Sequence, residues 1–349
     1  MKVLITGAAG FIGYHVAKEL IKKGYEVIGL DSINDYYDVN LKYDRLEEAG
    51  ISRDSIQWNI LVVSNISSNY RFVQMNLKET ELLHNLFAEI GFDIVINLAA
   101  QAGVRYSISN PMAYVESNVM GFLNILECVR NNKIKHLIYA SSSSVYGING
   151  EVPFAEHFNT DKPVSIYAAT KKSNELMAYT YSHLYKIPIT GLRFFTVYGP
   201  WGRPEMAPVL FAKSIVEDKP IKVFNNGNLS RDFTYVDDIV SGVCKVMELN
   251  APVPGPSTTG HVSPPYRIFN IGNNSPVKLM YFIELMEKAL GKKAVKEMLP
   301  MQQGDVYETY ADIDALKTLT GYQPTTSIES GIEKFVEWFK SYYTSRKSS

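Results

Sequence analysis

Short apolar runs alternate with amphipathic stretches along the first half of the chain. The pattern predicts strands and helices in turn, with strands at 2–5, 26–30, 72–75, 93–98, 136–140 and 187–195, and helices at 11–23, 79–89, 113–131 and 167–185. Strands that alternate with helices in this way indicate a parallel sheet with helices on both faces. Ligands of such sheets bind beyond the carboxyl ends of the strands, so we expect a site at that edge.

The pattern loosens in the second half, where prolines and glycines become frequent and the predicted helices lie at 236–248, 279–290 and 328–341. A chain of 349 residues suits one large domain with a smaller one attached. We predict an α/β fold with a Rossmann-type doubly wound parallel sheet over residues 1–196. A smaller C-terminal α/β domain is expected over 197–349, with a segment at about 231–248 crossing back.

Composition and net charge argue against several classes of binding partner. Hydrophobic residues make up 46% and charged residues 20% of the chain, which is an ordinary globular balance. A net charge of -1 gives no general attraction to nucleic acid or to anionic membranes, and we expect neither partner. Cys128 and Cys244 lie in apolar, helix-like stretches and are predicted to be buried thiols. No Cys/His spacing suits a metal, so no metal is expected, and a start without a signal-peptide pattern predicts a cytoplasmic protein.

Three glycines follow the first predicted strand and open the first predicted helix. Gly7, Gly10 and Gly13 have the spacing Gly-x-x-Gly-x-x-Gly, which permits a tight turn and close approach of the backbone to a pyrophosphate. The same spacing can serve a turn without a ligand, but the flanking strand and helix favour a dinucleotide. Asp31 ends the second strand, where a carboxylate accepts both ribose hydroxyls and repels a 2′-phosphate. The cofactor predicted is therefore NAD.

A tyrosine and a lysine four residues apart suggest acid/base chemistry. Tyr167 and Lys171 share one face of a predicted helix, where an ammonium would favour the phenolate. The spacing alone is not specific, because Tyr14 is followed four residues later by Lys18 in the same way. What distinguishes Tyr167 is that it follows a buried strand that ends in the serines 141–144. One of those hydroxyls can hydrogen-bond a reacting sugar oxygen beside the phenol.

At this point the chain resembles the extended short-chain dehydrogenase/reductase family over nearly its whole length. The resemblance rests on the glycine turn, Asp31, residues 97–100, the serine strand and the segment 167–171. It implies Ser142 as a catalytic hydroxyl, Tyr167 as the acid/base and Lys171 as its orienting partner, which also holds the cofactor. The cofactor site expected comprises Gly7, Gly10, Phe11, Ile12, Gly13, Asp31, Asn34, Asn76, Leu77, Leu98, Ala99, Ala100, Asn118, Tyr167, Lys171 and Phe194. Asn76 and Asn97 depart from the family, which more commonly has Asp and His there.

Further segments are similar to those with which family members hold nucleotide sugars. Arg231 suits a diphosphate, although an ion pair with Asp232 or Asp237 is the plainer alternative. Within the segment 302–305, Asp305 matches a position that takes a nucleotide ribose, and Gln302 lies beside it. The segments 35–42, 100–107 and 195–207 resemble the UDP-glucuronate 4-epimerase subfamily, which places the matches of Thr196 and Arg203 near the sugar carboxylate. The substrate site expected comprises Arg105, Ser142, Ser143, Thr196, Arg203, Arg231, Gln302 and Asp305.

The expected reaction is inversion at C4 of a UDP-sugar through a transient 4-keto intermediate, with UDP-glucuronate converted to UDP-galacturonate as the first expectation. Ser143 and Ser144 stand where dehydratases and decarboxylases of the family carry acids, which leaves the ketone no obvious route except reduction. Three alternatives stay open: an epimerase for UDP-glucose, UDP-N-acetylglucosamine or a pentose; a dehydratase or decarboxylase; and a silent NAD-binding regulator. The resemblance also implies a homodimer, formed through the helices at 113–131 and 167–185.

Overall fold

The computed structural model describes residues 1–148, 150–255, 262–301 and 306–345. By the density of its internal contacts the chain divides into two compact units. Unit 1 comprises 1–148, 158–193 and 242–269, and unit 2 comprises 149–157, 194–241 and 270–349. The segment expected to cross back at about 231–248 is thus shared between the two units.

Unit 1 is built on an eight-stranded sheet in the order β11-β7-β6-β5-β1-β2-β4-β3. Its strands are β1 (Lys2–Thr6), β2 (Glu26–Asp31), β3 (Leu61–Val63), β4 (Tyr70–Gln74), β5 (Ile94–Asn97), β6 (His136–Ser142), β7 (Ile189–Phe194) and β11 (Tyr266–Ile271). The pairs from β6 through β5, β1 and β2 to β4 are parallel, whereas β3 joins the edge antiparallel to β4. This sheet confirms the predicted Rossmann-type α/β class.

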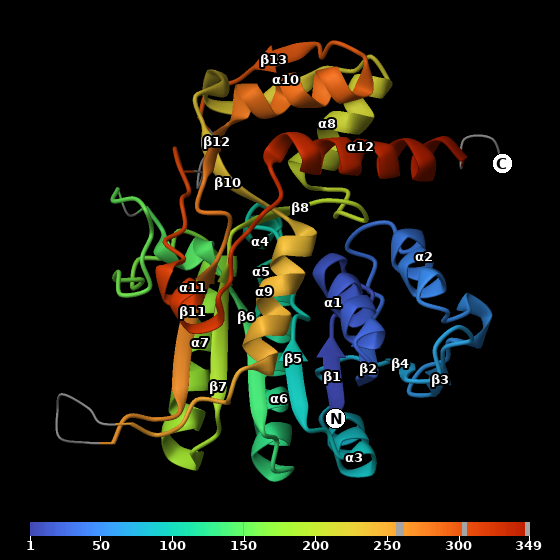
Figure 1. Cartoon of the computed structure of the whole chain (residues 1–349), viewed down its shortest axis with the longest axis vertical. Helices are drawn as coiled ribbons and strands as arrows, with labels where there is room; N and C mark the ends of the chain where they lie inside the picture. Colours follow the sequence, from blue (N-terminus) through green and yellow to red (C-terminus); the bar gives the residue numbers. More distant parts are fainter. Residues whose placement is uncertain (149, 256–261, 302–305, 346–349) are drawn as a thin grey trace. The chain divides into compact units, whose positions relative to one another are not determined.

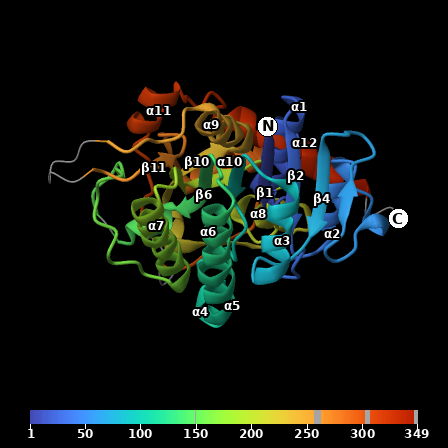
Figure 2. The ribbon, with the colours of Figure 1, turned by 90° about the horizontal axis from the view of Figure 1, so that it is seen from below.

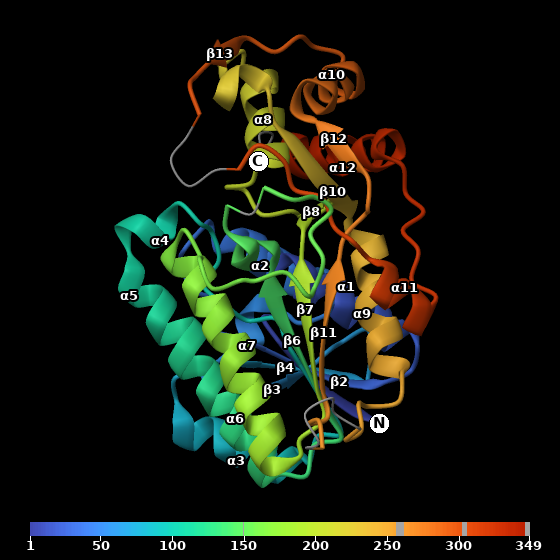
Figure 3. The ribbon, with the colours of Figure 1, turned by 90° about the vertical axis from the view of Figure 1, so that its left-hand side faces the viewer.

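Helices cover both faces of this sheet, as a doubly wound fold requires. The helical elements of unit 1 are α1 (Phe11–Lys22), α2 (Asn40–Glu48), η1 (Arg53–Ser55), α3 (Thr80–Ile90), α4 (Tyr106–Ser109), α5 (Pro111–Tyr114), η2 (Val115–Met120), α6 (Gly121–Asn131), η3 (Ser143–Tyr146) and α7 (Ile166–Tyr185). Helices α3, α6 and α7 lie side by side on one face, and α1 lies on the other (Figures 2 and 3).

The main core of unit 1 forms between the sheet and helices α3 and α6. Leu4, Val95 and Leu137 point from three neighbouring strands into a cluster that includes Phe122 and Leu126 of α6, and all of them are buried. Strands buried on both faces have nearly unbroken apolar sequences, which is why β1, β5 and β6 were predictable. Burial of each such side chain stabilises the fold by about 1.5–3 kcal/mol.

Unit 2 carries two small sheets and a layer of helices (Figure 1). The three-stranded sheet contains β8 (Thr196–Tyr198), β10 (Ser230–Tyr235) and β12 (Pro276–Lys278), and the two-stranded sheet pairs β9 (Ile221–Val223) with β13 (Lys296–Met298). The helical elements are α8 (Ala207–Val216), η4 (Phe224–Gly227), α10 (Leu279–Leu290), α11 (Asp314–Thr320) and α12 (Ile328–Ser345), and α9 (Val236–Glu248) runs from unit 2 into unit 1. Phe233 and Phe282 stack in its core with ring centroids 4.4 Å apart.

Two parts of unit 1 differ from the expected pattern. The helix predicted at 113–131 is interrupted by the π-helical segment η2 (Val115–Met120). The polar stretch between β2 and β4, expected as an irregular surface segment, contains helix α2 and strand β3. Helix α2 buries Lys42 and Arg45, which are 5% and 0% exposed, and polar residues of this kind hide a helix from a search for apolar periodicity.

Within the described ranges, no helix is both long and apolar enough to cross a membrane. Cys128 and Cys244 are buried free thiols, as predicted, and burial raises the pKa of each to about 12. Neither is therefore a thiolate near neutral pH.

Candidate active site

The predicted cofactor and catalytic residues of unit 1 gather at the carboxyl ends of four neighbouring strands. In the order β6-β5-β1-β2, register pairs Tyr139 with Asn97, Asn97 with Thr6 and Thr6 with Leu30. Ser142 and Asp31 end β6 and β2, and Ala99 and Gly7 follow β5 and β1. Because parallel strands end at one edge, the topology brings these four positions to the same edge of the sheet.

The glycine turn after β1 has no room for side chains. Gly7 has φ +75°, and a Cβ there would lie 2.9 Å from the backbone nitrogen of Ala99. A Cβ on Gly10 would lie 2.9 Å from the Gly7 carbonyl oxygen, and one on Gly13 only 2.0 Å from it. Helix α1 therefore begins directly against the strand end, with its N-terminal N–H groups at the sheet edge. A backbone cradle of this kind suits the pyrophosphate of a dinucleotide.

Asp31 is held in place by the backbone of this turn. Its carboxylate accepts hydrogen bonds from the N–H groups of Ala9 at 3.1 Å and Ile33 at 2.8 Å, and it is buried. The lone pairs that remain on a carboxylate fixed in this way can accept ribose hydroxyls. The exposed Asn34 accepts, through its carbonyl and its side-chain oxygen, hydrogen bonds from the Lys42 ammonium, both at 2.6 Å.

Arg45 is a cofactor-side residue that the sequence reasoning missed. It is fully buried, and Nη1 donates to the carbonyl oxygen of Ala9 and to the Tyr37 hydroxyl, both at 2.8 Å. Since Ala9 also donates to Asp31, Arg45 helps to hold the glycine turn from the side of α2. The only signal in the sequence was a pair of cations three residues apart, Lys42 and Arg45, which is also common on exposed helix faces.

The loop after β5 is fixed by polar contacts with its neighbours. Asn97, where the family more often has His, accepts a hydrogen bond from the Thr6 hydroxyl at 2.7 Å, and Thr6 Oγ1 accepts one from the Ala99 N–H at 3.1 Å. The half-buried Leu98, Ala99 and Ala100 follow directly. The departure at Asn97 therefore keeps a buried polar link between β1 and β5.

Asn118 joins this loop to helix α7. Its amide exchanges hydrogen bonds with the backbone of Gln101, at 2.7 and 3.0 Å, and donates to the Thr170 hydroxyl at 3.0 Å. It lies in the π-helical turn η2 and is buried. Asn76, the second departure, accepts a hydrogen bond from the Lys78 N–H at 3.0 Å and lies beside the buried Leu77. Phe194 is buried at the end of β7.

Helix α7 presents Tyr167 and Lys171 beside the end of β6. Ser165 caps the helix by accepting a hydrogen bond from the Ala168 N–H at 3.1 Å, which starts α7 at Ile166, directly before Tyr167. The Lys171 ammonium donates to the carbonyl oxygen of Ala140 at 2.8 Å, and α7 packs against β6 and η3. Tyr167 is half-buried, with Tyr114 edge-on at 6.1 Å between ring centroids.

Ser142 ends β6 and begins the turn η3. Its hydroxyl oxygen accepts a hydrogen bond from the Ser144 N–H at 3.2 Å, and the two hydroxyls are also 3.2 Å apart. Ser143, next in the chain, is half-buried. Ser142, Tyr167 and Lys171 thus belong to two elements in direct contact, and a hydroxyl, a phenol and an amine are available there for proton transfer.

Burial of Lys171 has an electrostatic cost. The side chain is 3% exposed, and burial lowers its pKa to about 8. The amine is therefore mainly charged at neutral pH, but it can lose its proton more readily than a surface lysine. An ammonium at this depth stabilises an anion on the same helix face more strongly than it would in water.

The residues predicted to hold the nucleotide sugar lie mostly in unit 2. Thr196 begins β8, and Arg231 lies on β10, where Nη1 donates to the carbonyls of Ser230 at 2.9 Å and Tyr307 at 3.2 Å. Arg203 is 3.3 Å from Glu205, which makes an ion pair. Gln302 and Asp305 lie outside the described residues. Arg105 is exposed in unit 1, directly before α4.

Asp232, one of the two acids considered as an ion-pair partner of Arg231, is hydrogen-bonded to other residues. Its carboxylate accepts hydrogen bonds from the N–H groups of Asn273 at 2.8 Å, Asn274 at 3.1 Å and Ala311 at 2.9 Å. Burial raises the pKa of Asp232, although these hydrogen bonds oppose the rise. The acid therefore organises the backbone of unit 2 around β10.

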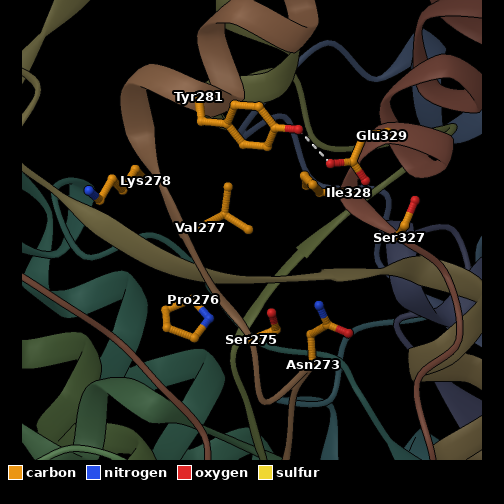
Figure 4. Close-up of a pocket in the computed structure, with 9 residues that line it drawn as sticks. All are labelled: Asn273, Ser275, Pro276, Val277, Lys278, Tyr281, Ser327, Ile328 and Glu329. Atoms are coloured by element: carbon orange, nitrogen blue, oxygen red, sulfur yellow. Dashed lines mark hydrogen bonds between the residues drawn. The ribbon is translucent and has the colours of Figure 1, made fainter.

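Unit 2 also contains an open pocket of about 460 Å³ that includes no predicted site residue (Figure 4). Among its lining residues, the Tyr281 hydroxyl donates a hydrogen bond to Glu329 at 2.6 Å. The lining residues are Asn273, Ser275, Pro276, Val277, Lys278, Tyr281, Ser327, Ile328 and Glu329. In the part of the chain that is described, no group of three or more His, Cys, Asp or Glu side chains is arranged to hold a metal ion.

The fold and the glycine turn define a Rossmann-type dinucleotide-binding protein. A model of the NAD dependent epimerase/dehydratase family matches residues 3–272, and the chain belongs to that family. This confirms the predicted family and its cofactor, NAD.

The chain has close relatives among known proteins. It is 53% identical to Protein CapI of Staphylococcus aureus, over 98% of this chain and 99% of that protein. It is 46% identical to the probable UDP-glucuronate 4-epimerase of Rhizobium meliloti, over 98% of each. Among solved structures it resembles the UDP-glucuronic acid 4-epimerase of Bacillus cereus in complex with UDP-glucuronic acid and NAD. That likeness has a TM-score of 0.85 at 33% identity, and covers 98% of this chain and 100% of that one.

Replacing Gly13 by Ala tests the glycine cradle. A Cβ 2.0 Å from the Gly7 carbonyl must push α1 away from β1, so we expect the free energy of unfolding to fall by about 3 kcal/mol and NAD binding to be lost. Urea unfolding and the absorbance of bound cofactor measure the two effects. Gly150→Ala is the control, because a Cβ there meets nothing within 4 Å. Equal stability and equal NAD binding of the two variants would contradict the role of Gly13 in the cradle.

The buried amine gives a pH-dependent prediction for NAD-free protein. Because the pKa of Lys171 is about 8 when folded and higher when unfolded, the folded chain binds fewer protons between these values. Stability from this site therefore rises with pH through that window. The difference in unfolding free energy between Lys171→Met and the parent should shift by about 2–3 kcal/mol in favour of the parent between pH 7 and pH 10. Denaturant unfolding at several pH values measures this difference. If the unfolding free energies of the two proteins changed in parallel with pH, the lowered pKa of Lys171 would be refuted.

Proposed function

We propose that this protein is an NAD-dependent UDP-glucuronate 4-epimerase, which interconverts UDP-glucuronate and UDP-galacturonate. The observation that supports this most is the placement of Tyr167 and Lys171 on a helix packed against the strand that ends in Ser142, beside a glycine cradle. The likeness to the Bacillus cereus enzyme, solved with UDP-glucuronic acid and NAD, supports the substrate. The family membership supports the reaction class.

The residues of unit 1 fit NAD. The cradle of Gly7, Gly10 and Gly13 would receive the pyrophosphate, because any Cβ there would fill the space that the backbone leaves. Asp31, already oriented by two N–H groups, would accept the adenosine ribose hydroxyls. Lys171 would hold the nicotinamide ribose. When bound, NAD supplies the acceptor and later the donor of the hydride at C4 of the sugar.

Tyr167 is the proposed acid/base. Its phenolate removes the proton of the 4-hydroxyl as C4 is oxidised, and the phenol returns a proton when C4 is reduced from the opposite face. The Lys171 ammonium favours the phenolate by charge. Ser142 hydrogen-bonds the same sugar oxygen and keeps it directed at the phenol. Between the two half-reactions, the 4-keto sugar rotates within the proposed active site and presents its opposite face.

The residues after Ser142 favour epimerisation over elimination. Ser143 and Ser144 stand where dehydratases and decarboxylases of the resembled family have acids, and the Ser144 hydroxyl lies 3.2 Å from that of Ser142. Neither serine is an acid or base that could move a proton at another carbon near neutral pH. The ketone is therefore left to be reduced at C4, and NAD is regenerated in each cycle.

Substrate recognition is proposed for the residues expected from the sequence. Arg231 would hold the diphosphate, as a guanidinium does well. Thr196 and Arg203 would contact the sugar carboxylate, which needs such partners once it leaves water. Arg105, Ser143, Gln302 and Asp305 complete the proposed set. A neutral UDP-sugar is the rival substrate and lacks the carboxylate.

Incubating the purified protein with UDP-glucuronate, without added NAD, should give UDP-galacturonate in the NMR spectrum. Tyr167→Phe should lower kcat at least a hundredfold while bound NAD is retained, because only the proton transfer is lost. Tyr14→Phe is the matched control, since Tyr14 has the same spacing to Lys18 but lies on α1. Faster turnover of UDP-glucose would favour the neutral-sugar epimerase, whereas accumulation of NADH or release of CO2 would refute epimerisation. Unchanged activity of Tyr167→Phe would refute its role.

We further propose a homodimer formed through the layer of α5, η2, α6 and α7. These elements lie side by side on the outer face of unit 1 (Figure 3). They leave large apolar side chains in solvent, each 39% to 62% exposed: Met112, Met120, Leu123, Leu176, Tyr179 and Leu184. Exposed apolar side chains gathered on neighbouring helices favour an interface, and a second copy presents the same surface.

Leu176→Asp should convert the dimer to a monomer, because it places a charge in the proposed apolar interface. Sedimentation velocity at micromolar concentration measures the change. Val253→Asp, at a position 77% exposed in a loop, is the control and should leave the mass unchanged. A parent protein that sediments as a monomer would refute the proposal.

A cytoplasmic location is also proposed. It is supported by Cys128 and Cys244, which are buried as free thiols and not joined in a disulfide. Thiols of this kind are usual in a reducing compartment.

A further inference from the structure

A buried ion pair fixes helix α7 against strand β7 behind the catalytic residues. Arg193 Nε and Nη2 donate to the two carboxylate oxygens of Glu175, each at 2.9 Å. The side chains are 4% and 5% exposed. Glu175 lies on α7, one turn after Lys171, and Arg193 lies near the end of β7. The bidentate geometry sets both the distance and the orientation of the two elements.

Two hydroxyl groups extend this ion pair to both sides of Ser142. The Ser141 hydroxyl donates to Glu175 Oε1 at 2.6 Å. Arg193 Nη1 donates to the Tyr146 hydroxyl at 2.9 Å, and the guanidinium carbon lies 4.8 Å from the centre of the Tyr146 ring. Ser141 directly precedes Ser142, and Tyr146 ends the turn η3 that follows it. The side chains of Ser141 and Tyr146, on either side of Ser142, are thus both hydrogen-bonded to one buried ion pair.

Arg193 keeps its positive charge in this buried position. Burial by itself would lower the pKa of Arg193, but the hydrogen bonds and negative charge of Glu175 outweigh it and raise the pKa. A buried salt bridge is a weak source of stability, since well-packed apolar residues often stabilise a fold as much. What it offers is fixed geometry among three elements, which apolar side chains do not impose.

We propose that the Glu175–Arg193 ion pair, with Ser141 and Tyr146, is a positioning element of the active site. It sets the separation between Ser142 on β6 and the pair Tyr167 and Lys171 on α7. The carbonyl that accepts from Lys171 belongs to Ala140, the neighbour of Ser141, so a shift at Ser141 moves that acceptor as well. None of the four side chains is required to touch the substrate. As a statement about catalysis, the inference rests on the proposed function.

Removing Glu175 or Arg193 alone would leave an uncompensated buried charge and could prevent folding. The test therefore uses Ser141→Ala and Tyr146→Phe, which cut the two neutral links and leave the ion pair in place. Ser173→Ala is the matched control, because Ser173 also lies on α7 but its hydroxyl donates to the helix's own carbonyl at Ala169. For each variant, kcat and KM for UDP-glucuronate, bound NAD and Tm are measured.

We expect kcat to fall about tenfold to a hundredfold in both variants, because a small misplacement of reacting groups is costly. KM, bound NAD and Tm should stay close to those of the parent. The isotope effect on kcat with UDP-[4-²H]glucuronate should rise, because chemistry becomes slower than the other steps. A lower Tm with unchanged kcat would show a purely structural role, and kcat equal to that of Ser173→Ala would likewise overturn the proposal.

A second readout does not depend on any substrate. In NAD-free protein with labelled lysine, NMR follows the titration of Lys171, assigned by Lys171→Met. Ser141→Ala should lower the pKa of Lys171 further below about 8, because a displaced Ala140 carbonyl no longer supports the ammonium. An unchanged titration would overturn the positioning role even if the parent proved inactive on UDP-glucuronate. Inactivity of the parent together with the expected shift would refute the proposed function alone.

Discussion

The close approach of helix α1 to the end of strand β1 is the constraint on which the rest of the site depends. A Cβ at Gly13 would lie 2.0 Å from the Gly7 carbonyl, so the first turn of the helix can rest on the strand only with glycine there. That contact places helical N–H groups at the edge where Asp31, Ala99 and Ser142 emerge. Were α1 displaced, the backbone cradle and the carboxylate fixed by Ala9 would separate, and Ser142, the proposed catalytic serine, would face no cofactor.

The sequence was most informative where structure is set by local rules. Strands β1, β5 and β6 are buried on both faces, so their unbroken apolar runs identified them directly. Glycine spacing reflects backbone geometry that no other residue allows, and Tyr167 with Lys171 are neighbours on one helix. For these positions a few adjacent residues contain the whole physical reason, and the predicted class and cofactor followed from them.

Other features depend on contacts between residues far apart in the chain, and local patterns do not reveal them. Arg45 is buried because its guanidinium reaches Ala9, 36 residues away. Glu175 and Arg193 are charged residues that would be expected on the surface, and their burial depends on each other. Asn118 lies in a π-helical turn that periodicity cannot register. Short strands such as β8 and β9 have too few residues to show an alternation.

The interleaving of the two units along the chain has a consequence for biosynthesis. Unit 1 is assembled from three separate stretches, the last ending at residue 269, and β11 is an edge strand of its sheet. A ribosome delivers residues in order, so this sheet cannot be completed until roughly three quarters of the polypeptide has emerged. Until then β7 presents an unpaired edge, and nascent chains are exposed to mispairing with one another. Neither unit can therefore be obtained by simple truncation of the gene. To express unit 1 by itself, its three stretches would have to be joined to one another across the stretches of unit 2 that separate them.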